Sequence, residues 1–151
     1  MIRLPLVARV HARRARRDRK AQQLAAHPLF EGLTSRQLRL ATSCIDIMWV
    51  NQGKVLARQG SMPVETFVIN RGRANVLLVG VIVSSVDRRQ TVGILARHHG
   101  VPFGATLVAA TDMELYVVAP RCVRTFVELL PGAIAEPWSD FSPRARVRAA
   151  A

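Results

Sequence analysis

The sequence has few acidic residues, few aromatic residues and no long apolar run. Its 151 residues include 10 Asp and Glu against 22 Lys and Arg, a net charge of +12, and 5% of them are aromatic. No apolar run reaches the roughly 18 residues that a membrane-spanning helix needs, so we expect no transmembrane segment. The basic start lacks a continuous apolar core and a cleavage site, which argues against a signal peptide. These absences favour a cytoplasmic protein that attracts anionic partners.

Residue sets that carry common enzyme chemistry are also missing. No Ser/His/Asp or Cys/His set and no close pair of acids stands out, so we expect no enzyme. The four histidines have no paired metal-ligand spacing, and His98 and His99 would point about 100° apart on a helix. Cys44 and Cys122 lie far apart and outside any metal spacing. We therefore expect no metal site, and two buried thiols in a reducing compartment.

Half of the residues are apolar, which is enough for one domain with a sizeable core. The composition divides the chain into three parts. Residues 1–26 form a basic N-terminal arm, residues 27–132 form the folded domain, and residues 133–151 form a Pro-interrupted, loosely ordered basic tail.

The N-terminal arm concentrates positive charge. Residues 1–26 hold eight Lys and Arg but one acid, Asp18, so this sixth of the chain has a charge of +7. No Gly or Pro interrupts residues 12–26, which favours a helix. Its first half has almost no apolar face. It is therefore either a solvated arm or a contact for a polyanion, such as nucleic acid, ribosomal RNA or an anionic membrane. The candidate polyanion-binding residues are Arg9, Arg13, Arg14, Arg16, Arg17, Arg19 and Lys20.

From Ile45 to Val118 the chain is a series of short runs rich in Val and Ile, broken by Gly turns about every ten residues. This pattern predicts an antiparallel barrel or jelly roll. A short helix capped by Thr34 or Ser35 precedes it, and a helix ended by Pro131-Gly132 follows it. Alternation within the runs predicts a set of inward side chains: Ile47, Trp49, Val55, Phe67, Ile69, Val76, Leu107, Leu115 and Val117.

One segment, "VGILARHHGVPFGAT" at 92–106, has the composition of a ligand cradle. Glycines at 93, 100 and 104 and a proline at 102 bracket a short helix. Backbone N–H groups in such a turn converge on an anion. A charged or sugar-bearing ligand would also need an acid and a base here, and neither stands where it is expected.

Three quoted segments, "HPLFEGLTSRQLRLA", "GKVLARQG" and "FVINRGRANV", resemble the cyclic nucleotide-binding domain of catabolite-activator type. Gly53, Leu56 and Gly60 match one spaced motif of that family, and Phe67, Ile69 and Gly72 match the next. The resemblance runs from about His27 to Gly132. It implies a mainly β fold, a cyclic nucleotide-binding-type β-roll (a double-stranded jelly roll) with flanking helices.

The resemblance also implies where a nucleotide would bind. The family's phosphate-binding cassette reads Phe-Gly-Glu, a short helix, then Pro-Arg-Thr/Ala-Ala; its Glu holds the ribose hydroxyl and its Arg pairs with the cyclic phosphate. Ile94 occupies the Glu position and Phe103 the Arg position, and Arg97 is the nearby cation. The backbone positions of the cassette are kept at Gly93, Ala96, Pro102 and Ala105. A basic turn, Val86–Gln90, replaces the family's Gly-rich turn before it.

These features favour a stand-alone regulatory or interaction module in which ordinary cyclic AMP binding is weakened or lost. Only about 19 residues follow Gly132, too few for a helix-turn-helix output domain. Two alternatives remain: a sensor of a less polar small ligand, and a basic adaptor that uses its arm on RNA, a ribosome or a membrane surface. The sequence assigns no certain cofactor and is compatible with a protein partner. It determines neither the oligomeric state nor whether the chain is a decayed copy.

Overall fold

A computed structural model gives the structure of the protein and describes residues 6–130. The chain divides into two compact units, Met1–Ser43 and Cys44–Ala151. The predicted tail at 133–151 and the helix stop at Pro131-Gly132 lie outside the described residues. No helix within residues 6–130 combines the length and the apolar character that a bilayer crossing requires.

The first unit is helical. The expected arm helix is α1 (Leu6–Ala25), followed by a 3-10 turn η1 (Pro28–Phe30) and by α2 (Ser35–Ser43). Near the end of α1, Leu24 is fully buried, and α1 packs against α2. Thr34 caps α2: its Oγ1 accepts from the Gln37 N–H at 3.2 Å, while Gln37 Oε1 accepts from the Thr34 N–H at 2.9 Å. This reciprocal capping box confirms the predicted start of the helix.

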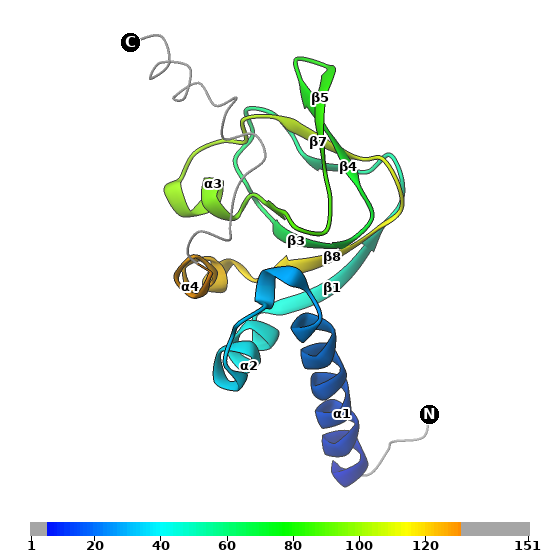
Figure 1. Cartoon of the computed structure of the whole chain (residues 1–151), viewed down its shortest axis with the longest axis vertical. Helices are drawn as coiled ribbons and strands as arrows, with labels where there is room; N and C mark the ends of the chain where they lie inside the picture. Colours follow the sequence, from blue (N-terminus) through cyan, green and yellow to red (C-terminus); the bar gives the residue numbers. More distant parts are fainter. Residues whose placement is uncertain (1–5, 131–151) are drawn as a thin grey trace. The chain divides into compact units, whose positions relative to one another are not determined.

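The second unit is a β-roll of two four-stranded antiparallel sheets, which confirms the predicted fold class (Figure 1). The first sheet has the order β1-β8-β3-β6 and the second the order β2-β7-β4-β5. The strand bounds are β1 Ile45–Val50, β2 Val55–Ala57, β3 Thr66–Arg71, β4 Ala74–Leu78, β5 Val81–Val86, β6 Thr91–Val92, β7 Thr106–Ala109 and β8 Met113–Val118. Helix α3 (Ile94–His99) joins β6 to β7, and η2 (Pro120–Cys122) and α4 (Val123–Leu129) follow β8.

The core fills the space between the sheets and confirms most of the predicted inward side chains. Phe67, Ile69, Val76, Leu107 and Leu115 are all buried there. The prediction is wrong for β1: Ile47 is 39% exposed and Trp49 is 65% exposed. In this strand Met48 and Val50 face the core instead, opposite Leu115 and Met113 of β8. Since "IDIMWV" is apolar at both parities, alternation alone could not choose the inner face.

The two cysteines form a disulfide, so the prediction of two separate buried thiols is wrong. Cys44 directly precedes β1, and Cys122 lies in η2, just after β8. These strands pair antiparallel with Ile45 opposite Val118, and the Ala119 N–H donates to the Cys44 carbonyl at 2.9 Å. Their pairing brings the two Cα atoms to 5.8 Å despite a sequence separation of 78. The argument from free thiols for a reducing compartment loses its basis with this bond.

Candidate ligand site

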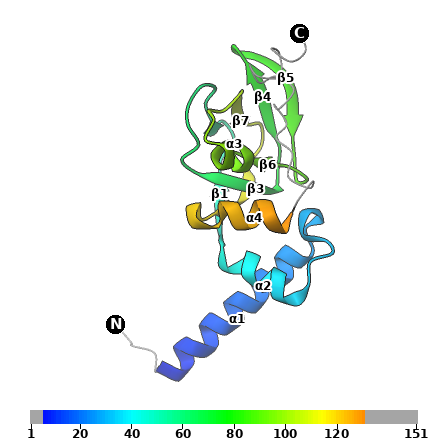
Figure 2. The same ribbon diagram turned by 90° about the vertical axis from the view of Figure 1, so that its left-hand side faces the viewer.

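The segment that resembles a phosphate-binding cassette lies between β6 and β7. Its helix α3 is six residues long and begins after Gly93, which adopts a left-handed conformation with φ 81°. It ends at Gly100, also left-handed, whose N–H donates to the carbonyls of Ala96 and Arg97. Helix α3 packs against α4 and β3, and Figure 2 shows it in front of the strands, above α4. The turn, short helix and second turn that the glycines predicted are therefore present in the structure.

The aromatic ring of Phe103 occupies the space beside Gly93. A Cβ atom built on Gly93 would lie 3.0 Å from Phe103 Cε1 and 3.3 Å from its Cζ, so a side chain there would require the Phe103 ring to shift, and the positive φ of Gly93 would strain it as well. Phe103 is buried within the core of the β-roll, and Ile94 is fully buried as well. The two positions at which the family carries a Glu and an Arg thus hold apolar side chains that are withdrawn from solvent.

Backbone hydrogen bonds fix Phe103 to the loop after β2. Its N–H donates to the Ser61 carbonyl at 2.9 Å, and its carbonyl accepts from the Gly60 N–H at 2.9 Å. These two bonds explain why Gly60, one of the spaced glycines of the sequence, lies near the cassette although it is 43 residues away from Phe103. The loop and the cassette form one hydrogen-bonded structure.

Arg97 is engaged by the same loop. Its Nη1 donates to the carbonyls of Pro63 at 3.0 Å and Val64 at 2.9 Å. A guanidinium held by two carbonyl oxygens bridges α3 to the loop, and a phosphate that approached Nη1 would have to compete with these acceptors. Arg97 therefore has a structural role that the sequence did not suggest.

The other sequence-predicted pocket residues divide by burial. Ala96 and Ala105 are buried, Ala105 within the core cluster, whereas Pro102 is exposed. The structure brings Gly93 and Phe103 into direct contact.

The basic segment before the cassette is a closed turn. Asp87 Oδ1 accepts from the Arg89 N–H at 3.3 Å, and the Asp87 N–H donates to Gln90 Oε1 at 2.9 Å. The Gln90 carbonyl accepts from the Ile69 N–H of β3 at 3.1 Å. Side-chain bonds thus replace the glycines that the family uses at this turn.

On the arm, the predicted polyanion-binding residues all lie in helix α1. Arg9 through Arg19 are exposed and Lys20 is half-buried. Five of the seven follow the helical spacing i, i+4, i+7, i+8, i+11, and therefore share one face: Arg9, Arg13, Arg16, Arg17 and Lys20. Arg14 and Arg19 lie away from this face, and Asp18 lies opposite it.

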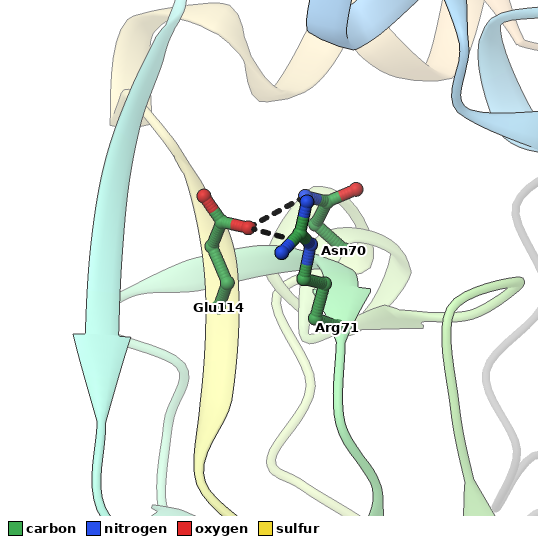
Figure 3. Close-up of polar contacts among 3 residues, drawn as sticks. All are labelled: Asn70, Arg71 and Glu114. Carbon is green, nitrogen blue, oxygen red and sulfur yellow. Dashed lines mark hydrogen bonds and ion pairs between the residues drawn. The ribbon is translucent and has the colours of Figure 1, made fainter.

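A buried carboxylate on β8 was not found from the sequence (Figure 3). Glu114 Oε2 accepts from Asn70 Nδ2 at 2.8 Å and pairs with Arg71 Nε at 3.4 Å. Burial raises the pKa of the nearby Tyr116, the Glu114 charge raises it further, and Arg88 and Arg71 lower it. Asn70 and Glu114 face each other across β3 and β8. The cluster therefore lies at the end of the first sheet where β3 ends and β8 begins. Only the pairing of these strands, remote in sequence, could have revealed it.

No protein-family model and no curated protein matches the chain. Solved structures do match. A mutant of a cAMP-binding acyltransferase from Mycobacterium smegmatis is 26% identical with a TM-score of 0.64, over 78% of this chain and 38% of that one. The CBD2 domain of PKAR bound to Sp-2Cl-cAMPS is 16% identical with a TM-score of 0.63, over 89% of this chain and 86% of that one.

A third match is the regulatory subunit of a cAMP-independent protein kinase A from Trypanosoma cruzi bound to guanosine, 18% identical with a TM-score of 0.61. It covers 78% of this chain and 41% of that one. The chain spans about two fifths of the length of the acyltransferase and of the Trypanosoma cruzi subunit. These similarities cover most of the chain and show that it has the cyclic nucleotide-binding domain fold.

Proposed function

We propose that the protein is a regulatory or interaction module of the cyclic nucleotide-binding fold in which ordinary cyclic AMP binding is weakened or lost. The observation that carries this proposal is the Phe103 ring against Gly93, at the position where the family's Arg would meet the cyclic phosphate. The fully buried Ile94 supports it, because this position would otherwise supply the carboxylate for the ribose.

The energetic argument rests on two lost charged hydrogen bonds. Each contributes about 1.5–3 kcal/mol, so the loss of both removes roughly 3–6 kcal/mol. This corresponds to a loss in affinity on the order of 10²- to 10⁴-fold. An apolar wall also penalises a phosphate that has no partner. Binding through Nη1 of Arg97 would have to compete with its contacts to two carbonyl oxygens.

Isothermal titration with cyclic AMP and cyclic GMP tests the proposal. We expect weak or no binding by the wild type and partial recovery by Ile94→Glu combined with Phe103→Arg, because the Glu would accept from the ribose hydroxyl and the Arg would pair with the phosphate. Each single change should do little, because a lone charge in an apolar site carries its own desolvation cost. Circular dichroism controls for folding, since Phe103 is a core residue. Tight binding by the wild type would contradict the proposal.

A less polar ligand is a variant of the same proposal. The matched Trypanosoma cruzi regulatory subunit is bound to guanosine, a nucleoside without a phosphate. Apolar side chains at positions 94 and 103 suit an uncharged ligand better than an anion. A saturable thermal shift with guanosine or adenosine, but not with cyclic AMP, would support this variant.

The one-sided charge of α1 favours a second function, an adaptor that binds RNA through its arm. Arg9, Arg13, Arg16, Arg17 and Lys20 span about 16 Å along one helix face at 1.5 Å per residue. A row of cations that neutralises successive phosphates binds nucleic acid in a strongly salt-dependent way.

Deletion of residues 1–20 should abolish binding of single-stranded RNA at low salt. The matched pair of variants is Arg13→Gln/Arg17→Gln on the face and Arg14→Gln/Arg19→Gln away from it, since both remove two charges. We expect the first pair alone to lower the slope of log affinity against log salt, by about 1.4. If the truncated chain binds RNA as well as the full chain, the arm is only a solvated tail. Loss of binding to anionic vesicles alone would assign the arm to a membrane instead.

A further inference from the structure

The hairpin that joins β4 and β5 exposes apolar side chains at the edge of the second sheet. Strand β5 is the last strand of this sheet, and the tip of the hairpin lies at the end of the β-roll remote from β1 and α4 (Figures 1 and 2). Val79, Val81 and Ile82 are 87%, 63% and 60% exposed. Neighbouring apolar side chains of this size on a surface mark an interaction site.

The turn at this tip is strained by an apolar residue. Leu78 pairs with Val81, so Val79 and Gly80 form a two-residue loop, and both have positive φ, 49° and 76°. Such loops favour Asn-Gly or Asp-Gly, because a β-branched side chain is disfavoured at positive φ. Val79 is the single non-glycine residue with positive φ in the described part of the chain. A side chain that strains the turn and faces solvent does not serve the fold, and backbone strain of this kind is concentrated at functional sites.

Both faces of the hairpin tip are apolar. Leu78 and Val81 pair on the face that continues the core, and Leu77 and Ile82 pair on the opposite face. The exposed Val81 and Ile82 thus point to opposite sides of one ribbon. A flat protein surface would cover one side of this ribbon, whereas the boundary between lipid headgroups and acyl chains surrounds an inserted tip on both sides.

The charge around the tip matches an anionic surface. Residues 66–86 contain no acid, and the strands of the hairpin carry no charged residue at all. The Val79 N–H donates to Gln59 Oε1 at 3.1 Å, which places the segment with Arg58 beside the tip. Residues 44–130, which include the hairpin, hold nine Lys and Arg against six Asp and Glu, so this unit is cationic and is attracted to anionic lipid.

We propose that the β4–β5 hairpin inserts its tip, Leu77–Val83, into the surface of an anionic lipid bilayer, as a peripheral contact independent of any nucleotide site. Apolar burial at the interface and attraction between the cationic chain and anionic headgroups act together in such binding. Insertion into a bilayer gives the strained Val79 a role, whereas neither the fold nor the cassette explains this residue.

The decisive variant is Val79→Asn in the full chain. Asn suits positive φ, so the variant should have a higher urea midpoint than the wild type while it binds vesicles of 70% phosphatidylcholine and 30% phosphatidylglycerol about tenfold more weakly. The control Leu40→Gln removes an exposed apolar side chain from α2 and should leave vesicle binding unchanged. Equal binding by wild type and Val79→Asn would overturn the proposal.

A second measurement separates the hairpin from the arm. Val81→Trp should show a blue-shifted emission on anionic vesicles, relative to the wild type, and quenching by brominated acyl chains. Vesicle binding without this shift would mean that the arm alone holds the membrane and would overturn insertion of the hairpin. Sedimentation velocity provides the last outcome: if the wild type is a dimer and Val79→Asn a monomer, the hairpin is an interface between two copies and the membrane proposal is wrong.

Discussion

At the scale of single residues, Ile94 and Phe103 stand where the resembled family has a Glu and an Arg. They affect ligand binding less through their lack of charge than through their place in the packed core. Phe103 is part of the core of the β-roll, and its ring lies against Gly93, where a side chain would require the ring to shift. A polar ligand would therefore have to displace core packing as well as forgo its charged partners. The proposed loss of nucleotide binding would then follow from folding itself, because the same ring stabilises the native state.

Tyr116 allows a residue-scale prediction, because it is the sole tyrosine of the chain. Burial, with the charge of Glu114, raises its pKa above the ordinary value. A group whose pKa is raised in the folded state contributes stability that is complete below its unfolded pKa, about 10, and is lost as the pH rises through the folded value. We expect the free energy of unfolding to fall above pH 10.

Absorbance at 295 nm measures the ionisation of Tyr116 directly, since no other tyrosine contributes. It should occur at a higher pH in the folded chain than in urea. Tyr116→Phe should remove the corresponding step from the dependence of stability on pH, although other groups that titrate there remain. A midpoint at or below 10 in the folded protein would contradict the prediction.

At the scale of elements, the disulfide joins the start of β1 to η2, and α4 follows η2 directly. It therefore ties the helix that packs on α3 to the first sheet. Because β1 and β8 are already paired, the bond acts chiefly by restricting the unfolded chain.

Removal of the bond by Cys44→Ala with Cys122→Ala should lower the free energy of unfolding by about 2–4 kcal/mol. Urea denaturation followed by circular dichroism measures this loss. Reductant should shift the wild-type midpoint in the same direction and leave that of the double variant unchanged. Coincident curves for the wild type with and without reductant would show that the bond does not form in solution.

The strand elements show how far the sequence could predict the fold. Glycine-bounded apolar runs predicted an antiparallel barrel or jelly roll, and the family resemblance specified the β-roll. Most of the described glycines have positive φ and mark turns of the fold. Gly72 is the clearest example, since its φ is +90° and a Cβ there would lie 2.5 Å from the Asp112 carbonyl oxygen. The inner face of β1 was not predictable, because its strand partner decides between two apolar parities.

At the scale of the whole molecule, the features that could not be predicted from the sequence are contacts between segments remote in sequence. The position of Ile94 and Phe103 in the cassette was readable from spaced residues, but the ring of Phe103 against Gly93 was not. The disulfide, the Glu114 cluster and the bonds from Arg97 to the loop at Pro63 and Val64 also join such segments. The distribution of charge, by contrast, was fully readable, since more than half of the excess lies in the first 26 residues.

The disulfide also makes the β-roll a closed covalent ring. All eight strands and α3 lie between Cys44 and Cys122, whereas α1, α2 and α4 lie outside the ring. A single peptide bond cut in the hairpin, the cassette or any other loop of the ring opens the circle without producing two molecules, and the fragments stay joined until the bond is reduced. A cut before Cys44 releases the basic arm at once. Proteolysis before Cys44 can therefore remove more than half of the excess positive charge, while the strands of both sheets remain covalently connected.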